Sequence, residues 1–333
     1  MKKVRWGILS TARIGMDKVI PAMLEGVHTE IRAIASSDIV KAARCAEKLS
    51  IPNYYGSYAE LLSDPEIDAV YIPLPNHLHV EWTMKSLEAG KHVLCEKPIA
   101  LNAHIGEELV RAQRQYPHLR IMEAFMYKFH PQWKSIRALI DEGAIGEVKY
   151  VESRFTYYNT NPDDIRNQRE IGGGGLLDIG CYCISLARFI FNDEPRRVFG
   201  SIERDAETKI DSLTSGILEF AQGRSTFTCS TQLAPSQHAT IFGAKGRIEI
   251  DIPFTPFPDN VATVTCHNAS GARKIEFERF NQYTMQGDEF SLSILNNTPA
   301  PVPISDAVAN MRVIDAVFES AEEQRWITLP KNA

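Results

Sequence analysis

Residues 4–15, VRWGILSTARIG, decide the fold of this chain. The apolar run VRWGIL predicts a buried strand, and the turn STARIG leads from it into a helical pattern. Three more apolar runs, EIRAIAS, DAVYIPLP and KHVLCEKP, follow before residue 100, and helical patterns separate them. Strands that alternate with helices of this length form a parallel sheet with right-handed crossovers. We therefore predict a doubly wound α/β sheet in the N-terminal part.

The rest of the chain has a different pattern. Helices are predicted at residues 130–142 and 176–191, with a long alternating strand, GEVKYVESRFTYY, between them. From residue 196 onward, short apolar runs follow one another with tight turns, which is typical of an antiparallel sheet. A last helical pattern has Ser305 as its predicted N-cap. We predict an α/β domain at 1–122, an α+β domain with a large open-faced, mostly antiparallel sheet at 123–304, and a C-terminal helix at 305–330 that packs back on the body.

Composition argues against several classes of partner. The chain has 36 basic and 42 acidic residues, a net charge of -6, and no basic run, so we expect no nucleic-acid partner. Neither a signal peptide nor an apolar stretch of membrane-spanning length is evident, so we expect a cytoplasmic protein that does not bind a membrane. The only close cysteine pair, Cys181 and Cys183, has no neighbouring ligand in sequence, so we expect reduced thiols and no metal site.

The first turn resembles a phosphate-binding turn. A strand that ends at a helix start places backbone N–H groups and the positive helix end where a pyrophosphate binds. The turn keeps Gly7 and Gly15 of the three-glycine fingerprint but has Ser10 and Ala12 at the positions of closest approach. A packing turn is the competing interpretation. We predict a Rossmann dinucleotide-binding domain whose turn contacts come from Gly7, Ser10, Thr11, Ala12, Arg13 and Ile14.

The second strand bears on which dinucleotide binds. An acidic residue at its end would hydrogen-bond the adenosine ribose and repel a ribose phosphate. This strand ends instead in Ser36 and Ser37, and the cations of Arg13 and Lys41 are expected nearby. NADP(H) is therefore favoured. NAD(H) is the alternative, because a small shift of the turn would bring Asp38 to the ribose.

A lysine follows the apolar strand HVLC, in the segment CEKP. Residues just beyond the carboxyl end of a strand face the ligand crevice in doubly wound sheets, which makes Glu96 and Lys97 candidates for function. A solvated surface charge is the competing interpretation of Lys97. A cis peptide bond between Lys97 and Pro98 would aim the ammonium group into the crevice.

A glycine run precedes the second candidate pair. Four glycines at 172–175 allow the chain to approach a cofactor closely, and the helix after them carries Asp178 and Tyr182 at i and i+4, on one face. An acceptor and a titratable hydroxyl then point the same way. A capping aspartate and a core tyrosine are the competing interpretation.

These motifs together resemble one known family. GILSTARIG, PLPNHLH, CEKP, EAFMYKFHP and GGGGLLDIGCYC occur in this order over nearly the whole chain, and they resemble the Gfo/Idh/MocA oxidoreductases. Within that family the chain is most similar to the branch of dimeric trans-dihydrodiol dehydrogenases, NADP-dependent D-xylose dehydrogenases and deoxysugar ketoreductases. The reason is Tyr182, which stands where the inositol dehydrogenases carry a histidine.

The resemblance implies a dehydrogenase or reductase that acts on CH–OH groups. Lys97 would orient the substrate oxygen, Tyr182 would be the acid/base, and Asp178 would position substrate. A tyrosine has an ordinary pKa of about 10 and needs a nearby cation to ionise near neutral pH, which a lysine supplies. For His79 a structural role at a helix start is an equal alternative. The resemblance also implies cofactor contacts from Pro73, Leu74, Pro75, Asn76, His79, Glu96 and Lys97.

The substrate is expected to contact the second half of the chain. Alternate residues of a strand face opposite sides, so Arg154 and Tyr158 form one set and Phe155 and Tyr157 the other. Aromatic faces with a few polar donors suit a sugar or a cyclic diol. The resemblance adds the IR dipeptide before the glycine run. The predicted substrate contacts are Phe125, Tyr127, Arg154, Arg166 and Asp178.

Two other functions use the same residues differently. A non-catalytic NAD(P)-binding sensor or regulator would need no proton relay, so the presence of both Lys97 and Tyr182 argues against it. A glycosidase or lyase that holds and recycles NAD is the third hypothesis. We also expect a homodimer through the open sheet, on the assumption that its outer face is apolar.

Overall fold

The structure is a computed structural model that describes residues 2–256 and 261–330. The chain divides into two compact units, and each contains two separate segments. Unit 1 comprises Met1–Phe129 and Asn281–Val308, and unit 2 comprises His130–Phe280 and Ala309–Ala333.

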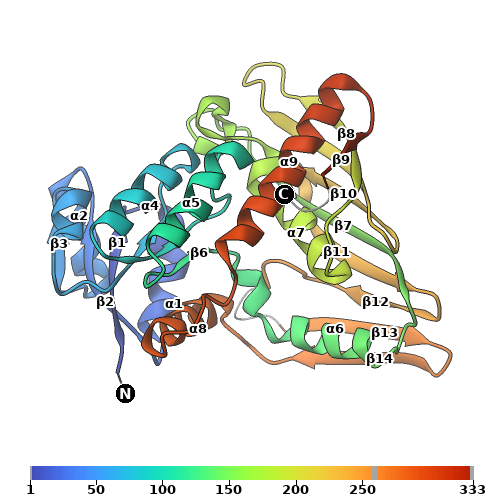
Figure 1. Cartoon of the computed structure of the whole chain (residues 1–333), viewed down its shortest axis with the longest axis horizontal. Coiled ribbons are helices and arrows are strands. Elements are labelled where there is room, and N and C mark those ends of the chain that lie inside the picture. Colours follow the sequence, from blue (N-terminus) through green and yellow to red (C-terminus); the bar gives the residue numbers. More distant parts are fainter. Residues whose placement is uncertain (1, 257–260, 331–333) are drawn as a thin grey trace. The chain divides into compact units, whose positions relative to one another are not determined.

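Unit 1 is built on a six-stranded sheet in the order β3-β2-β1-β4-β5-β6, whose neighbours all pair in parallel (Figure 1). The predicted Rossmann-type sheet is confirmed. The central strand β4 is fully buried, and β1 is buried apart from Arg5, because apolar side chains point to both faces, as expected of a sheet covered by helices. The strands are β1 (Val4–Leu9), β2 (Thr29–Ala35), β3 (Asn53–Tyr55), β4 (Ala69–Ile72), β5 (His92–Cys95) and β6 (Ile121–Glu123).

Polar side chains start several helices of unit 1. The Asn102 side chain accepts a hydrogen bond from the Ile105 amide at the start of α5, and Ser57 does the same for Glu60 in α3. A π-helical turn, Gly15–Val19, precedes α1. The helices are α1 (Ile20–Leu24), α2 (Ile39–Leu49), α3 (Tyr58–Leu62), α4 (His79–Glu88), α5 (Ala103–Gln115) and α8 (Gln282–Leu295), with 3₁₀ turns at Asn76–Leu78 and Met126–Phe129.

Helix α8 belongs to unit 1, although it follows the strands of unit 2 in sequence. Its Asp288 carboxylate accepts hydrogen bonds from the Val27 and His28 amides at 3.0 and 2.7 Å. Its Ser291 hydroxyl accepts one from the Trp6 indole at 3.2 Å. We predicted no helix here and placed 281–304 in the second domain. The difference arises because these bonds join residues more than 250 positions apart in sequence, which no local pattern records.

Unit 2 contains a nine-stranded sheet in the order β14-β13-β12-β11-β7-β10-β9-β8-β15. Its pairs are antiparallel except β7 with β10, so the predicted mostly antiparallel sheet is confirmed. The strands are β7 (Val148–Tyr158), β8 (Arg197–Arg204), β9 (Asp211–Glu219), β10 (Arg224–Ser230), β11 (Gln232–Gly243), β12 (Gly246–Ile250), β13 (Ala262–Asn268), β14 (Gly271–Phe277) and β15 (Ile327–Thr328).

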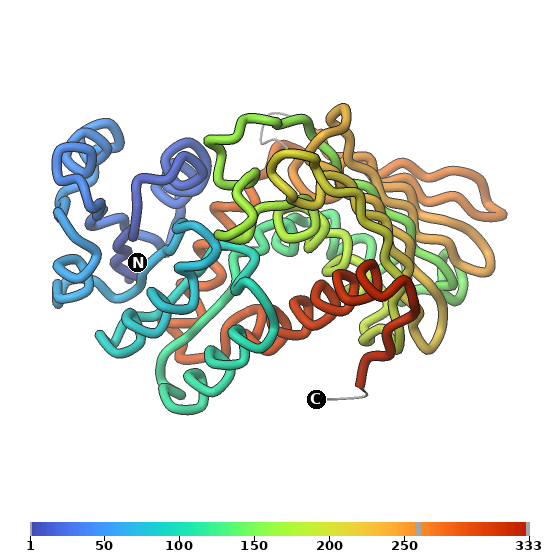
Figure 2. Tube along the Cα trace, turned by 90° about the horizontal axis from the view of Figure 1, so that it is seen from above, coloured from blue at the N-terminus to red at the C-terminus, as the bar shows by residue number. Residues whose placement is uncertain are grey.

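Helices α6 (Pro131–Asp141), α7 (Cys181–Phe191) and the later part of α9 (Ile304–Glu323) cover one face of this sheet (Figure 2). Short turns at Ile165–Asn167, Arg169–Ile171 and Leu176–Gly180 lead into α7, and the last of them is π-helical. Helix α9 begins at Ile304, so Ser305 lies inside its first turn and is not the N-cap that we predicted.

One segment corrects our expectation about apolar length. Arg169–Phe191 is long and apolar enough to cross a membrane by composition. However, 89% of its most apolar window is buried inside the protein, which is the behaviour of a core helix. The fold therefore accounts for the apolar character of this segment.

The outer face of the nine-stranded sheet is less apolar than we assumed. On β7 it carries Tyr150, Glu152 and Arg154, which lie opposite Phe242, Thr240 and His238 of β11. Most of these side chains are polar, and only the stacked rings of Tyr150 and Phe242 form an apolar pair among them. We predicted a homodimer because we assumed that this face is apolar. These side chains do not support that assumption, and the homodimer stays a prediction.

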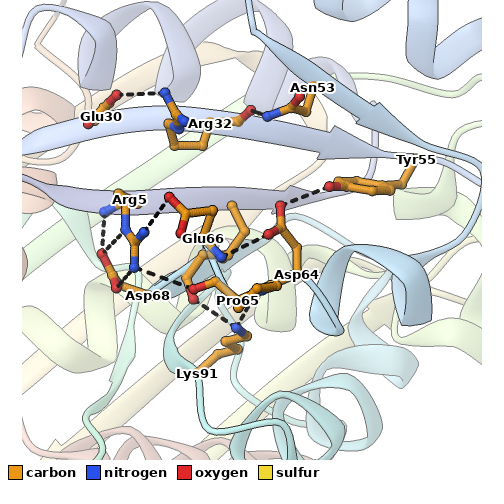
Figure 3. Close-up of polar contacts among 11 residues, drawn as sticks. Arg5, Glu30, Arg32, Asn53, Tyr55, Asp64, Pro65, Glu66, Asp68 and Lys91 are labelled. Carbon is orange, nitrogen blue, oxygen red and sulfur yellow. Dashed lines mark hydrogen bonds and ion pairs between the residues drawn. The ribbon is translucent and has the colours of Figure 1, made fainter.

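A network of ion pairs joins the amino ends of strands in unit 1 (Figure 3). Arg5 forms ion pairs of 2.7 Å with Glu66 and 2.8 Å with Asp68. The buried Lys91 ammonium donates to the carbonyl oxygens of Asp64 and Ile67 at 2.7 and 2.8 Å. These charged groups are paired or hydrogen-bonded at the amino ends of the strands. Ligands bind to such sheets at the opposite side, at the carboxyl ends. We assign the network to stability.

Candidate active site

The turn after β1 is held by its own serine. Ser10 has a φ of 135°, a left-handed conformation that favours glycine. Its hydroxyl accepts a hydrogen bond from the Ala12 amide at 2.9 Å and donates to the Pro73 carbonyl at 3.4 Å. The serine thus reproduces the backbone of the missing glycine, with internal hydrogen bonds that hold it there. Arg13 is exposed beside it, while Thr11 is buried.

Gly7 has a packing role in this structure. A Cβ atom on Gly7 would lie 2.5 Å from Leu61 Cδ2 of α3. The space that glycine provides is therefore filled by a leucine of the same unit. Our prediction of Gly7 as a cofactor contact has no support from this geometry.

Two serines follow β2, buried Ser36 and exposed Ser37, and the nearest carboxylate is engaged. Asp38 is the N-cap of α2, where its Oδ1 accepts hydrogen bonds from the Val40 and Lys41 amides at 2.9 and 3.1 Å. The Ser36 hydroxyl accepts one from the Asp38 amide at 3.2 Å. A capping carboxylate is stabilised by the positive end of its helix. Asp38 is therefore committed to the helix, and Ser36 and Ser37 occupy the strand end.

His79 is buried between two main-chain carbonyl oxygens. Its Nε2 lies 2.7 Å from the Leu74 carbonyl oxygen, and its Nδ1 lies 2.8 Å from that of Pro98. Burial lowers the pKa of His79 to about 4, which favours a neutral ring with one N–H donor. The side chain is 0% exposed, which favours the structural alternative for His79 over direct cofactor contact. It links the loops that follow β4 and β5.

We expect His79→Leu to lower the free energy of unfolding by about 1–3 kcal/mol, because it leaves a buried carbonyl oxygen without its donor. Urea denaturation would measure the loss. The matched control is His77→Leu, since His77 is exposed and should change stability by less than about 0.5 kcal/mol. Equal stabilities for the two variants would contradict the role assigned to the buried ring.

Carboxylates fix the chain on both sides of Lys97. Glu96 accepts a hydrogen bond from the Tyr71 hydroxyl at 2.6 Å and one from the Lys97 amide at 3.3 Å. Buried Glu123 of β6 accepts one from the Ile99 amide at 2.8 Å. The Lys97–Pro98 peptide bond is cis, as considered from the sequence. We did not predict Tyr71 or Glu123, although a glutamate inside the apolar run IMEAF was a usable signal.

In unit 2 a tyrosine and an arginine orient the carboxylate of Asp178. The Tyr157 hydroxyl donates to Asp178 Oδ2 at 2.6 Å, and Arg166 Nε lies 3.4 Å from the same oxygen. Arg166 also pairs with Asp164 at 3.2 Å. Burial and the Asp178 charge raise the pKa of Tyr157, so its hydroxyl stays protonated and continues to donate. The structure thus brings together Asp178 and Arg166, two residues that we predicted as substrate contacts.

Tyr182 lies in an aromatic group one helical turn after Asp178. Its ring centroid is 5.6 Å from that of Phe155 and 5.5 Å from that of Phe254. The side chain is 4% exposed, and these rings restrict how it can turn. Phe254 was not predicted, because it follows β12 and no motif connects it to α7.

Other predicted substrate contacts lie elsewhere. Arg154 is on the outer face of β7, where its Nε donates to the Ser236 hydroxyl at 3.1 Å, whereas Phe155 and Tyr157 face α7. Strand alternation places these sets on opposite faces, so Arg154 is not brought to Asp178. Phe125 and Tyr127 of unit 1 are 2% and 0% exposed, which is typical of core side chains.

The glycine run is shaped by contacts within unit 2. A Cβ atom on Gly174 would lie 1.9 Å from Asp211 Oδ1, and one on Gly173 would lie 2.7 Å from the Arg166 carbonyl oxygen. Our prediction that these glycines make room for a cofactor is therefore not supported. They make room for a buried carboxylate and for the chain itself.

Comparisons with known proteins identify the family of both parts of the chain. The model of an oxidoreductase family with an NAD-binding Rossmann fold matches residues 4–124, and the model of the GFO/IDH/MocA C-terminal domain matches residues 133–249. The D-xylose 1-dehydrogenase (NADP(+)) 2 of Haloferax volcanii is 36% identical, and the match covers 95% of this chain and 97% of the dehydrogenase. The trans-1,2-dihydrobenzene-1,2-diol dehydrogenase of Xenopus laevis is 34% identical, with coverages of 98% and 99%.

A solved structure gives the same result in three dimensions. The 3-ketoreductase KijD10 from Actinomadura kijaniata, in complex with NADP and TDP-benzene, superposes with a TM-score of 0.90 at 29% identity. The match covers 96% of this chain and 98% of the ketoreductase. Because both domain models and full-length relatives agree, this chain belongs to the Gfo/Idh/MocA family of oxidoreductases.

Proposed function

We propose that this chain is an NADP-dependent oxidoreductase that transfers hydride between nicotinamide and a carbon of a sugar, a sugar derivative or a cyclic trans-diol. One observation carries the proposal: Asp178 and Tyr182 lie on one short helical segment, with the Asp178 carboxylate oriented by Tyr157 and Arg166. The xylose and dihydrobenzenediol dehydrogenases named above support this substrate class.

The residues at the end of β2 fit NADP better than NAD. Ser36 and Ser37 bring no charge to the strand end, and Asp38 is held by the helix that it caps. Exposed Arg13 and Lys41 could pair with a phosphate on the adenosine ribose. When bound, the nicotinamide would supply or accept the hydride.

Each catalytic residue has a separate task in this proposal. The Lys97 ammonium group holds the substrate oxygen, and the backbone on either side of Lys97 is fixed by Glu96 and Glu123. The Tyr182 hydroxyl gives its proton to that oxygen in reduction and takes it back in oxidation. The Asp178 carboxylate accepts a hydrogen bond from a second substrate hydroxyl, which orients the ring that bears it.

Calorimetric titration with NADPH and NADH is the first test. We expect NADPH to bind at least about tenfold more tightly, a difference of about 1.4 kcal/mol. Aldoses and cyclic diols with NADP⁺ should then produce reduced nicotinamide, measured by its absorbance. Binding of neither dinucleotide would refute the assignment of cofactor. Binding without turnover across the panel would favour a sensor instead.

A further inference from the structure

We infer that Asp211 is a positioning residue of the proposed active site, because its buried carboxylate fixes the amino end of the helical segment that carries Asp178 and Tyr182. This inference rests on the proposed function. Asp211 is the first residue of β9, and no sequence motif connects it with the glycine run or with α7.

Hydrogen bonds join the Asp211 carboxylate to the start of this segment. Its Oδ2 accepts a short hydrogen bond from the Leu176 amide and another from the Thr214 hydroxyl at 3.2 Å. Leu176 begins the π-helical turn that contains Asp178, and α7 with Tyr182 follows directly. Asp211 is only 2% exposed, so water does not compete for these bonds. An anionic acceptor at a helix start is also favoured by the helix dipole.

The glycine run provides independent evidence for the same contact. Gly174 has a φ of 123°, and a Cβ atom there would lie 1.9 Å from Asp211 Oδ1. At Gly175 a Cβ atom would lie 3.5 Å from Asp211 Oδ2. Two adjacent glycines thus fit closely around one carboxylate. Any movement of Asp211 would release the turn on which Asp178 lies.

The charge of Asp211 is maintained against its surroundings. Burial raises the pKa of Asp211 to about 6, while its hydrogen bonds and Arg204 oppose that shift. The thiol of Cys229 also lies close enough to interact with this charge. Because the folded pKa exceeds the unfolded value of about 3.9, ionisation destabilises the fold as pH rises from about 4 through 6. A buried group that is ionised at neutral pH at the expense of stability is typical of functional sites.

The test compares wild type with Asp211→Asn, which keeps an oxygen acceptor and removes the charge. At pH 8 we expect kcat to fall at least about tenfold, since small displacements of reacting groups have effects of this size. The Kd for NADPH should stay unchanged, and stability should be no lower. Wild-type kcat should also decline below a pH near 6, and this acid limb should disappear in the variant. Asp205→Asn is the matched control, because the Asp205 carboxylate accepts its hydrogen bonds from the Thr208 amide and the Gln232 side chain.

The outcomes separate this inference from the proposed function. If wild type is active and Asp211→Asn keeps the same kcat, the inference about Asp211 fails while the proposed function stands. A variant that loses stability but keeps its kcat has the same consequence. If the variant does not fold, the wild-type pH profile still decides, because a profile flat through pH 6 contradicts the role. If wild type turns over no substrate, the proposed function fails. Hydrogen exchange of residues 176–182 at one pH then decides for Asp211: faster exchange in the variant supports positioning, and equal exchange refutes it.

Discussion

Replacing Tyr182 with phenylalanine is expected to lower kcat by about 10²- to 10⁴-fold, the usual contribution of a positioned acid or base. The substitution removes one hydroxyl group and keeps the ring. The contacts with Phe155 and Phe254 should therefore persist, and stability should change little. NADPH binding should be unaffected, because the dinucleotide residues belong to unit 1. Steady-state kinetics on the best substrate of the panel would measure the effect.

Two comparisons make this result specific. Tyr158→Phe removes a hydroxyl from a side chain that is 65% exposed, and it should leave kcat within about twofold of wild type. Lys97→Ala should reduce kcat/KM by a similar factor to Tyr182→Phe. The double variant should lose much less than the product of both factors, since residues that act as a unit are not additive. Normal turnover in either single variant would exclude the proposed proton transfer.

A second large effect is expected for Ser36→Asp, which should abolish or reverse the dinucleotide preference. Aspartate can still accept the hydrogen bond that the Asp38 amide gives to Ser36, so the turn should be retained. Its charge would repel a ribose phosphate of about −1.5 to −2 and would accept hydrogen bonds from an unmodified ribose. We expect the Kd for NADPH to rise about 10- to 100-fold, with NADH binding unchanged or tighter. Calorimetry on both proteins measures this directly.

The control for this switch is Asp38→Asn. Because the Asp38 carboxylate caps α2, its replacement by another good capping residue should leave the preference for NADPH as it is. If Asp38→Asn instead strengthened NADPH binding to the same degree that Ser36→Asp weakened it, Asp38 would be the residue that faces the ribose. The capping geometry would then not describe the complex.

Much of the fold could be predicted because its signals are local. The alternation of apolar strands and helical patterns before residue 123 led to the parallel sheet, and short turns after residue 196 led to the antiparallel one. Helix α8 escaped prediction because its contacts with Val27 and Trp6 depend on distant residues. The domain boundary shifted for the same reason.

The candidate site residues could be named from the sequence, but the groups that contact them could not. The motifs singled out Lys97, Asp178 and Tyr182, and the structure adds the hydrogen bond from Tyr157 to Asp178 and the one from the Leu176 amide to Asp211. The glycine run was interpreted as space for a cofactor, because glycine reports only that something lies close. In the structure the neighbour is the Asp211 carboxylate.

The sequence by itself determined the two sheets and the residues that could perform the chemistry, since periodicity and short motifs are properties of adjacent residues. Only the tertiary structure decided which face of β7 meets α7, that Asp38 caps a helix, that the Lys97–Pro98 bond is cis, and that His79 lies between two loops. These depend on how distant segments pack. A side chain's task is set by the groups that packing places within hydrogen-bonding distance, and neighbours in sequence carry no record of them.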